Sequence, residues 1–208
     1  MFDSIKEILI ATTNPGKVKE IQSCLGSGFK MLSLNDCKVN VEIEENGNTF
    51  EENSRIKATG YAKITGHITI ADDSGLEIDA LNGEPGIHSA RFSGPKEKGG
   101  ERTLIDHRNI AKVLELLKDV PEEKRQARFV CSLCMANPKE IILETKGTLE
   151  GIIIEKEIGD NGFGYDPIFY IPDLNKTVAQ LSNEQKNQVS HRGKAIKKLK
   201  EKLVKINI

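Results

Sequence analysis

The pattern of apolar and polar residues at the start of the chain predicts a strand, a loop and a helix. Residues 8–11 are all apolar, and the apolar positions within residues 18–25 recur at helical spacing. In the loop between them, Asn14 fits an N-cap and Pro15 fits the first helical position. The glycines that follow this segment predict the end of the helix.

A second helix and two strands are predicted next. The sequence T-F-E-E places a capping box at Thr49, and the predicted helix continues to about Ile64. Residues 67–71 form a short predicted strand, and residues 76–81 alternate like a second one. The polar sequence D-D-S-G between them is therefore expected at the C-terminal end of the first strand.

The second half of the chain predicts a helix, several strands and two further helices. Apolar residues at helical spacing within 110–117 predict the first helix. Three strand candidates follow in succession, which suggests antiparallel pairs: residues 127–136, 140–147 and 151–158. A loop over residues 160–170 then precedes a short helix after Ser182 and a C-terminal helix after Ser190.

These elements predict the α/β class. The chain has 208 residues, with 38% hydrophobic and 29% charged residues, which is enough to bury a core. No repeat, low-complexity run or linker interrupts the order of elements. We therefore expect a single domain over residues 1–208, with two lobes as a possible subdivision.

The overall charge excludes some classes of partner. Lys and Arg number 30 against 31 Asp and Glu, so the formal net charge of −1 gives no general attraction to nucleic acid or anionic lipid. The N-terminus lacks the pattern of a secretory signal, and no apolar run approaches membrane-spanning length. We expect a cytoplasmic protein without nucleic-acid or membrane partners.

The four cysteines include one C-x-x-C motif, at Cys131 and Cys134. This motif lies in a predicted strand, where positions three apart point to opposite faces. A reduced, structural role is favoured over metal binding or redox chemistry.

The hexapeptide T-T-N-P-G-K, Thr12 to Lys17, has the features of a phosphate site. A loop that enters a helix exposes unpaired backbone N–H groups and the positive end of the helix dipole, and Lys17 adds a mobile positive charge. It is not a Walker A loop, because the first glycine and the Ser/Thr after the lysine are absent. For this hexapeptide alone, an ordinary capped turn with a solvated lysine is the favoured alternative.

Two adjacent aspartates, Asp72 and Asp73, follow an apolar run. Like charges repel and Asp is disfavoured in strands, so local structure gains little from the pair. A divalent cation would reverse the repulsion, because Mg²⁺ is usually held by one or two carboxylates together with substrate phosphates. The alternative is an Asx turn. Further carboxylates that could contribute are Glu44, Glu45, Glu77 and Asp79.

The sequence F-G-Y-D-P, Phe163 to Pro167, concentrates two aromatics in a chain with only 5% aromatic residues. A nucleobase could stack there while Asp166 accepts hydrogen bonds. The alternative is that Phe163 and Tyr165 anchor the loop to the core.

The sequence S-H-R-G-K-A places His191 and Arg192 in the first turn of a helix that Ser190 caps. The helix dipole disfavours a protonated His191 there, so a neutral imidazole is expected. A cationic Arg192 at this position suggests that it is held for an anion or a carbonyl group. Lys186, on the preceding helix, could face the same space. The basic run after these residues is most simply a solvated helix face.

Together, TTNPGK, IADDSGLEIDALNGEPGIHSARFSG, GFGYDPIFY and SHRGKA resemble, in order and spacing, the inosine triphosphate pyrophosphatase family, the non-canonical purine NTP pyrophosphatases. The resemblance spans nearly the whole chain. It implies an elongated, two-lobed α/β fold around a long mixed twisted sheet flanked by helices, with the nucleotide in the cleft between the lobes, and a homodimer. It also implies Mg²⁺-dependent hydrolysis of ITP, dITP and XTP to the monophosphate and pyrophosphate, which removes deaminated purines from the nucleotide pool.

The resemblance also assigns roles to individual residues. The metal ligands would be Glu44 and Asp73, with Glu45 as the alternative to Glu44, and Asp73 would also be the catalytic base. Asp72 would support that site, and Ser74 would contact the substrate. The residues expected to hold the phosphates are Thr12, Thr13, Asn14, Pro15, Gly16 and Lys17, with Asn53 and Lys57 facing the same groups. The residues expected to form the nucleoside pocket are Phe163, Gly164, Tyr165, Asp166, Lys186, His191 and Arg192.

These roles give a mechanism and a basis for selectivity. Asp73 would orient or deprotonate a water that attacks the α-phosphorus, and Lys17 would stabilise the departing pyrophosphate. Arg192, which only donates hydrogen bonds, suits the 6-keto group of hypoxanthine or xanthine and not the 6-amino group of adenine. The rival classes are a pyrophosphatase for pyrimidine triphosphates and a non-enzymatic nucleotide sensor.

Overall fold

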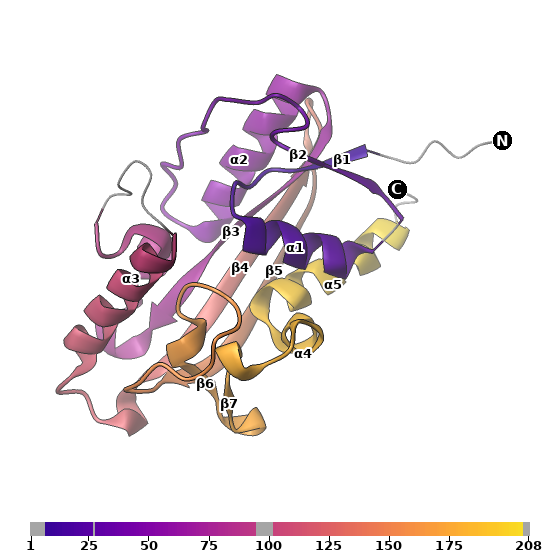
Figure 1. Ribbon diagram of the computed structural model, residues 1–208. Coiled ribbons are helices and arrows are strands. Elements are labelled where there is room, and N and C mark those ends of the chain that lie inside the picture. The colour runs from indigo at the N-terminus through magenta and orange to yellow at the C-terminus, as the bar shows by residue number, and fades with distance from the viewer. Residues whose placement is uncertain (1–6, 27, 95–101, 206–208) are drawn as a thin grey trace. The chain divides into compact units, whose positions relative to one another are not determined.

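The computed structural model describes residues 7–26, 28–94 and 102–205 (Figure 1). The chain divides into two compact units, each built from separate stretches of sequence. Unit 1 comprises residues up to 73 together with 131–147 and the chain from 190 onwards. Unit 2 comprises residues 74–130 and 148–189.

Within the described residues, the structure has the α/β class that the sequence predicts. The seven strands are β1 (Glu7–Ile10), β2 (Lys30–Ser33), β3 (Ile68–Ile78), β4 (Gln126–Ala136), β5 (Ile141–Ile153), β6 (Phe169–Ile171) and β7 (Lys176–Thr177). The α-helices are α1 (Pro15–Leu25), α2 (Phe50–Thr65), α3 (Arg102–Leu117), α4 (Asn183–Val189) and α5 (His191–Lys205). The strand order is β2-β1-β3-β4-β5-β6-β7. The sheet is mixed, because β1 pairs in parallel with β2 and β3, whereas β6 pairs antiparallel with β5 and β7.

In unit 1, helices cover both faces of the sheet. Side chains alternate along β1, so Ile8 and Ile10 pack in a cluster with α1 and α5, whereas Leu9 and Ala11 pack in another with α2. Helices α1 and α5 lie side by side on one face, and α2 lies on the other (Figure 1). Each face of the central strands is therefore buried, which explains their nearly continuous apolar sequence.

The predicted N-caps of the first two helices are confirmed, but the capping box at Thr49 is incomplete, because the Glu52 carboxylate accepts from the Asn48 amide at 2.6 Å and not from that of Thr49. The Asn14 side-chain oxygen accepts a hydrogen bond from the Gly16 amide at 3.0 Å, and Pro15 begins α1. The Thr49 hydroxyl oxygen accepts one from the Glu52 amide at 3.1 Å. These side chains satisfy backbone donors that a helix start leaves without intrahelical partners.

Two predictions about the strands are wrong. D-D-S-G does not follow a strand, because β3 continues without a break through these four residues. The two candidates over 140–147 and 151–158 are one strand, β5, which ends at Ile153. Glycine explains the second error: a Cβ atom on Gly147 would lie 2.1 Å from the His191 carbonyl oxygen, so this glycine serves close packing and not a turn.

The cysteines of the C-x-x-C motif lie on opposite faces of β4, as predicted. Cys131 packs with the cluster that contains α1 and α5, and Cys134 packs with the cluster that contains α2. Both are free thiols, and burial raises the pKa of each to about 12. Such thiols are inert at neutral pH, which fits a structural role.

Unit 2 has its own hydrophobic core. Its buried side chains come from β3, α3, β4 and β5 and from the chain between residues 165 and 181. Phe129 and Phe169 stack in this core with ring centroids 4.4 Å apart.

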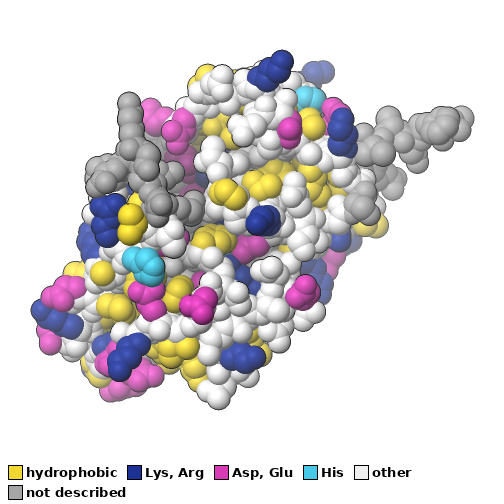
Figure 2. Space-filling view, in the orientation of Figure 1, with side chains coloured by type: hydrophobic (Ala, Val, Ile, Leu, Met, Phe, Trp, Pro, Cys, Tyr) yellow, Lys and Arg dark blue, Asp and Glu magenta, His cyan; other side chains and the backbone are white. Residues whose placement is uncertain are grey.

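The surface agrees with a net charge close to zero. On the face shown in Figure 2, Lys and Arg side chains alternate with Asp and Glu side chains instead of forming a field of one sign. In the part of the chain that the structure describes, no helix is long and apolar enough to cross a membrane.

Candidate active site

The two adjacent aspartates do not face each other. They are neighbours on β3, so their side chains point to opposite faces of the sheet. Asp72 contacts residues of α1 and α5, whereas Asp73 contacts residues of α2. The expectation that a metal ion between them offsets their repulsion is therefore wrong, and so is the alternative of an Asx turn.

Asp72 forms a buried ion cluster with two cations. Its Oδ2 atom lies 3.1 Å from Lys17 Nζ and 3.1 Å from Arg192 Nη2, and Nε of Arg192 also donates to it at 3.2 Å. Burial alone would raise the pKa of Asp72, but Lys17 and Arg192 outweigh this effect and hold the pKa well below its usual range. The lysine expected to be mobile is thus held by a carboxylate.

Arg192 is an internal counter-cation in this structure. Its side chain is 1% exposed, and besides Asp72 it also bonds to Glu20 through Nη1. Burial alone would lower its pKa, but these two carboxylates raise it, so the guanidinium stays charged. Recognition of a purine 6-keto group by Arg192 stays a prediction. Ser190, which accepts a hydrogen bond from the Gly193 amide at 3.0 Å, caps α5 as predicted.

Asp73 lies in a second cluster, on the α2 face. Its Oδ2 atom accepts a hydrogen bond from Asn53 Nδ2 at 3.3 Å, and its Oδ1 atom lies 3.1 Å from Lys57 Nζ. The same ammonium lies 2.5 Å from Glu45 Oε2. Asn53 also accepts a hydrogen bond from the Gly47 amide at 2.9 Å, which ties the acidic loop to α2. The helix spacing of Asn53 and Lys57 thus brings both onto Asp73.

The pKa of Asp73 is unusual for a carboxyl group with a cationic neighbour. Burial raises it, Lys57 and Lys17 lower it, and Glu45 raises it again, with a net pKa of about 6. A group that titrates close to neutral pH is suited to proton transfer, because both of its protonation states are accessible.

This shift predicts the pH dependence of stability. The folded pKa of about 6 exceeds the ordinary 3.8, so the contribution of Asp73 to stability is fully present below pH 4 and is lost as the pH rises through 6. Each pKa unit corresponds to about 1.4 kcal/mol, so Asp73→Asn should gain on the order of 2–3 kcal/mol relative to the wild type between pH 4 and 7. Urea unfolding without divalent metal measures the difference. Parallel pH profiles for the two proteins would contradict the assigned shift.

The start of α1 offers donors for an anion. Asn14 is buried, and the structure gives its Nδ2 atom no hydrogen-bond partner among the described residues. The first turn of α1 contains no acidic residue, so the backbone N–H groups and the helix dipole are not neutralised locally. Thr12 stabilises the loop by accepting a hydrogen bond from the Asn14 amide at 3.2 Å, while Thr13 and Pro15 are exposed. The arrangement fits a phosphate group.

The donor set around Asp73 fits Mg²⁺. Among the described residues, no group of three or more His, Cys, Asp or Glu side chains could hold a metal ion. Mg²⁺ does not need such a cage, because substrate phosphates and water complete its shell. Two hard carboxylate oxygens, from Asp73 and Glu45, already converge on one cation, the Lys57 ammonium. Glu44 is exposed, and Glu45 is the one that reaches this cluster.

In unit 2, the loop before β6 forms a second polar cluster. Lys186 Nζ lies 2.6 Å from Asp166 Oδ2, which also accepts a hydrogen bond from the Phe163 amide at 2.9 Å. The same ammonium lies 4.5 Å from the centroid of the Phe163 ring. Gly164 donates from its amide to Asp106 at 2.8 Å. Gly162 permits this turn, with φ of +84° and Asp166 too close for any Cβ atom.

The two aromatics of this loop have different environments. Tyr165 is buried in the core of unit 2 and donates from its hydroxyl to the Ser89 carbonyl at 2.8 Å. The alternative of an aromatic anchor therefore describes the position of Tyr165, whereas Phe163 is half-buried. Ser74, at the start of unit 2, is also half-buried, and His191 is buried in the first turn of α5.

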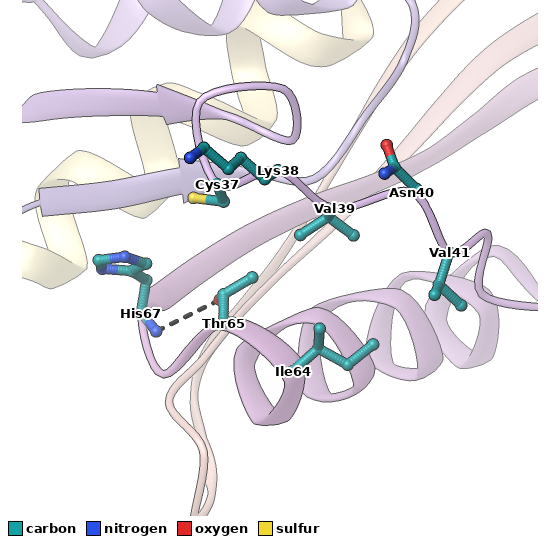
Figure 3. Close-up of a pocket in the computed structure, with 8 residues that line it drawn as sticks. All are labelled: Cys37, Lys38, Val39, Asn40, Val41, Ile64, Thr65 and His67. Carbon is teal, nitrogen blue, oxygen red and sulfur yellow. Dashed lines mark hydrogen bonds between the residues drawn. The ribbon is translucent and has the colours of Figure 1, made fainter.

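A hollow of about 380 Å³ in unit 1 lies elsewhere and contains none of the predicted site residues. It is lined by the C-terminal end of α2 and the loop after β2, and Figure 3 shows the His67 amide donating to the Thr65 hydroxyl there. The residues that line it are Cys37, Lys38, Val39, Asn40, Val41, Ile64, Thr65 and His67. The carboxyl groups with strongly shifted pKa values, Asp72 and Asp73, do not line this hollow.

Sequence reasoning missed two carboxylates. Glu20 bonds to Arg192, and Asp106 bonds to the Gly164 amide. The spacing of Glu20, three residues after Lys17 on α1, was a usable signal because such residues share a helix face. No local pattern pointed to Asp106, whose partner lies 58 positions away.

The mixed sheet with helices on both faces of its unit 1 part defines an α/β protein with buried ion clusters. Comparisons with known proteins identify its family. A family profile described as the Ham1 family matches residues 8–202. A dITP/XTP pyrophosphatase from an Exiguobacterium species is 48% identical over 199 residues, covering 95% of this chain and 97% of that protein. The solved structures of the Ham1 proteins from Staphylococcus aureus and Coxiella burnetii are also similar. The first is 44% identical, with a TM-score of 0.82, and the match covers 95% of this chain and 98% of that one. The second is 40% identical, with a TM-score of 0.84, and the match covers 97% of this chain and 100% of that one. This chain belongs to the Ham1 family.

Proposed function

We propose that this protein is a pyrophosphatase that hydrolyses dITP, XTP and ITP to the nucleoside monophosphate and pyrophosphate. The observation that carries the proposal is the 48% identity, over 95% of this chain, to a protein named dITP/XTP pyrophosphatase. Removal of such triphosphates keeps deaminated purines out of the nucleotide pool.

Asp73 is the proposed catalytic base. Its pKa of about 6 leaves it ionised at neutral pH yet basic enough to accept a proton from water. Asn53 holds one oxygen of this carboxylate, which fixes the direction of the other. Asp73 therefore orients the water that attacks the α-phosphorus and takes its proton.

The phosphate tail is assigned to the loop at the start of α1. The Asn14 Nδ2 atom, the backbone amides after Asn14 and the Lys17 ammonium are donors for phosphate oxygens. These groups stabilise the negative charge on the departing pyrophosphate. Thr12, Thr13, Pro15 and Gly16 shape this loop, and Asp72 positions Lys17.

Mg²⁺ is the proposed cofactor, held by Asp73 and by either Glu44 or Glu45. When bound, it neutralises phosphate charge and polarises the phosphoryl group. Glu45 is favoured by its position, 2.5 Å from the lysine that also contacts Asp73. Matched variants decide between the two: Glu45→Gln should raise the Mg²⁺ concentration needed for half-maximal activity by about tenfold or more, and Glu44→Gln should leave it nearly unchanged. The opposite ranking would assign the metal to Glu44.

The nucleoside is assigned to Phe163, Gly164, Asp166 and Lys186, with Ser74 as a further contact. Phe163 offers a ring face for the base, and Lys186 is held over that ring by Asp166. Tyr165 supports this loop from the core. His191 and Arg192 complete the proposed nucleoside set. We also propose that the chain forms a single domain and acts in the cytoplasm as a homodimer.

A product assay tests the function. Incubation with dITP and Mg²⁺ should release pyrophosphate and no orthophosphate, and dATP should react about tenfold or more slowly, because a mispaired buried polar group costs about 1–3 kcal/mol. Faster turnover of dTTP or UTP would identify a pyrimidine triphosphate pyrophosphatase instead. Binding of dITP without release of any product would identify a nucleotide sensor.

A further inference from the structure

Lys57 occupies an unusual position between two carboxylates. Its Nζ atom lies 2.5 Å from Glu45 Oε2 and 3.1 Å from Asp73 Oδ1, and its side chain is 11% exposed. These two carboxylates come from different segments, a loop before α2 and the strand β3. A single ammonium group therefore holds together two chain segments that otherwise repel each other.

The helix fixes this lysine in place. Lys57 lies one turn after Asn53 on α2, and both side chains contact the same carboxylate, one at each oxygen. Asn53 in turn accepts a hydrogen bond from the Gly47 amide, so the acidic loop is attached to α2 at two points. The position of the ammonium group is thus fixed by its place on α2 and by carboxylate partners that are themselves held to α2.

We propose that Lys57 is a built-in counter-cation that competes with the divalent metal ion for Glu45 and Asp73, so that metal binds tightly only when an anionic phosphate tail is present to receive the Lys57 ammonium. This inference rests on the proposed function, because it takes Asp73 and Glu45 as metal ligands. It adds that metal and phosphate binding are coupled through one side chain.

The coupling follows from charge and burial. A divalent cation and an ammonium group compete for the oxygen atoms of the same two carboxylates, and they repel each other there because both are positively charged. An ammonium displaced from its partners inside the protein loses its compensation, which is costly unless a new anion takes it up. Phosphate oxygens supply that anion. By linkage, a phosphate tail that favours metal binding is itself bound more tightly when metal is present.

A metal titration without nucleotide tests the competition. Binding of Mn²⁺ is followed by the loss of the electron paramagnetic resonance signal of the free ion, for the wild type, Lys57→Gln and Lys63→Gln. Lys57→Gln should bind Mn²⁺ about tenfold or more tightly than the wild type, because the competing cation is gone. Lys63→Gln is the matched control: it removes an exposed lysine from the same helix and should bind as the wild type does. Equal or weaker Mn²⁺ binding by Lys57→Gln overturns the inference.

A further variant separates this inference from the proposed function. Asp73→Asn should lose most Mn²⁺ binding if Asp73 is a metal ligand. Loss of binding in Asp73→Asn together with unchanged binding in Lys57→Gln overturns the role of Lys57 alone. Unchanged binding in Asp73→Asn overturns the metal site, and the inference falls with it.

A measurement on the wild-type protein covers the case in which Lys57→Gln does not fold. Side-chain nitrogen NMR detects ammonium groups that are held in ion pairs and exchange slowly with water. Saturating Mg²⁺ together with inorganic pyrophosphate should shift the Lys57 ammonium signal, while NaCl at the same ionic strength should not. A Lys57 signal that stays in place as the metal site fills overturns the competition.

Discussion

Replacement of Asp73 by asparagine is expected to reduce the rate of pyrophosphate release from dITP by about 10³-fold, since a positioned general base contributes about 10²–10⁴-fold. Asparagine keeps the size of the side chain and the contact with α2, but it cannot accept a proton from water. Binding of dITP measured without divalent metal should weaken far less, because the assigned phosphate donors lie on α1 and not on this residue. Steady-state kinetics and equilibrium binding of dITP measure the two effects separately.

The control for this variant is a change at its neighbour on α2. Asn53→Ala removes a hydrogen bond to Asp73 but leaves the carboxylate, so it should lower kcat moderately, by about tenfold. Near-normal kcat in Asp73→Asn would refute its assignment as the base.

Replacement of Asp72 by alanine is expected to destabilise the protein by about 3 kcal/mol, because removal of one partner from a buried ion pair leaves uncompensated charge. Arg192 would keep only Glu20, and Lys17 would lose its carboxylate. For a chain of this length the loss corresponds to a decrease in Tm of roughly 6–12 °C. Thermal unfolding at pH 7, followed by circular dichroism, measures it.

A second Asp–Arg pair provides the matched control. Asp79 lies 3.0 Å from Arg128, but its side chain is 48% exposed, and exposed pairs contribute about 1 kcal/mol or less. Asp79→Ala should therefore change Tm by only a few degrees. Equal effects of Asp72→Ala and Asp79→Ala would contradict the strong contribution of the buried cluster.

The pH dependence of the Asp72 cluster has the opposite sign to that of Asp73. The folded pKa of Asp72 lies well below its usual range, so its contribution is present above the ordinary carboxyl pKa and is lost only in strong acid. The destabilisation caused by Asp72→Ala should therefore be undiminished from pH 8 down to about pH 5.

The local elements of the fold were predictable because their signals are short in range. Asn14 with Pro15, and Thr49, mark helix starts through side chains that bond to their own backbone neighbours. The continuity of β3 was not predictable in this way. Two adjacent aspartates are unfavourable in a strand. The strand forms because lysine and arginine residues distant in sequence pair with them, among them Arg192, 120 positions from Asp72.

Some contacts of the candidate site residues were predictable from helix spacing, but the geometry around the two aspartates was not. The sequence placed Asn53 and Lys57 on one helix face, and in the structure both contact Asp73. The sequence placed Lys186 towards the space of His191 and Arg192, and its ion pair with Asp166 was not predicted. It could not reveal that Asp72 and Asp73 serve different clusters, because only the unbroken strand puts them on opposite faces. Nor could it decide between Glu44 and Glu45, which differ by one position in a loop without regular structure.

The separation of the two aspartates gives them different environments. Asp72 is buried among permanent cations and stays ionised, which suits the positioning of Lys17 and Arg192. Asp73 has a pKa of about 6, and its partners are the Asn53 amide group and the Lys57 ammonium. Environments that push the pKa values of neighbouring carboxyls apart are a recurring basis for acid–base chemistry in enzymes.

The most direct measurement is a crystal structure of the protein with Mg²⁺ and a non-hydrolysable analogue of dITP. We expect an oxygen of Asp73 in the metal shell, at about 2.1 Å, with the same ion bound to phosphate oxygens of the analogue. A complex in which the nucleotide and metal are bound while Asp73 remains paired only with Asn53 and Lys57 would contradict it.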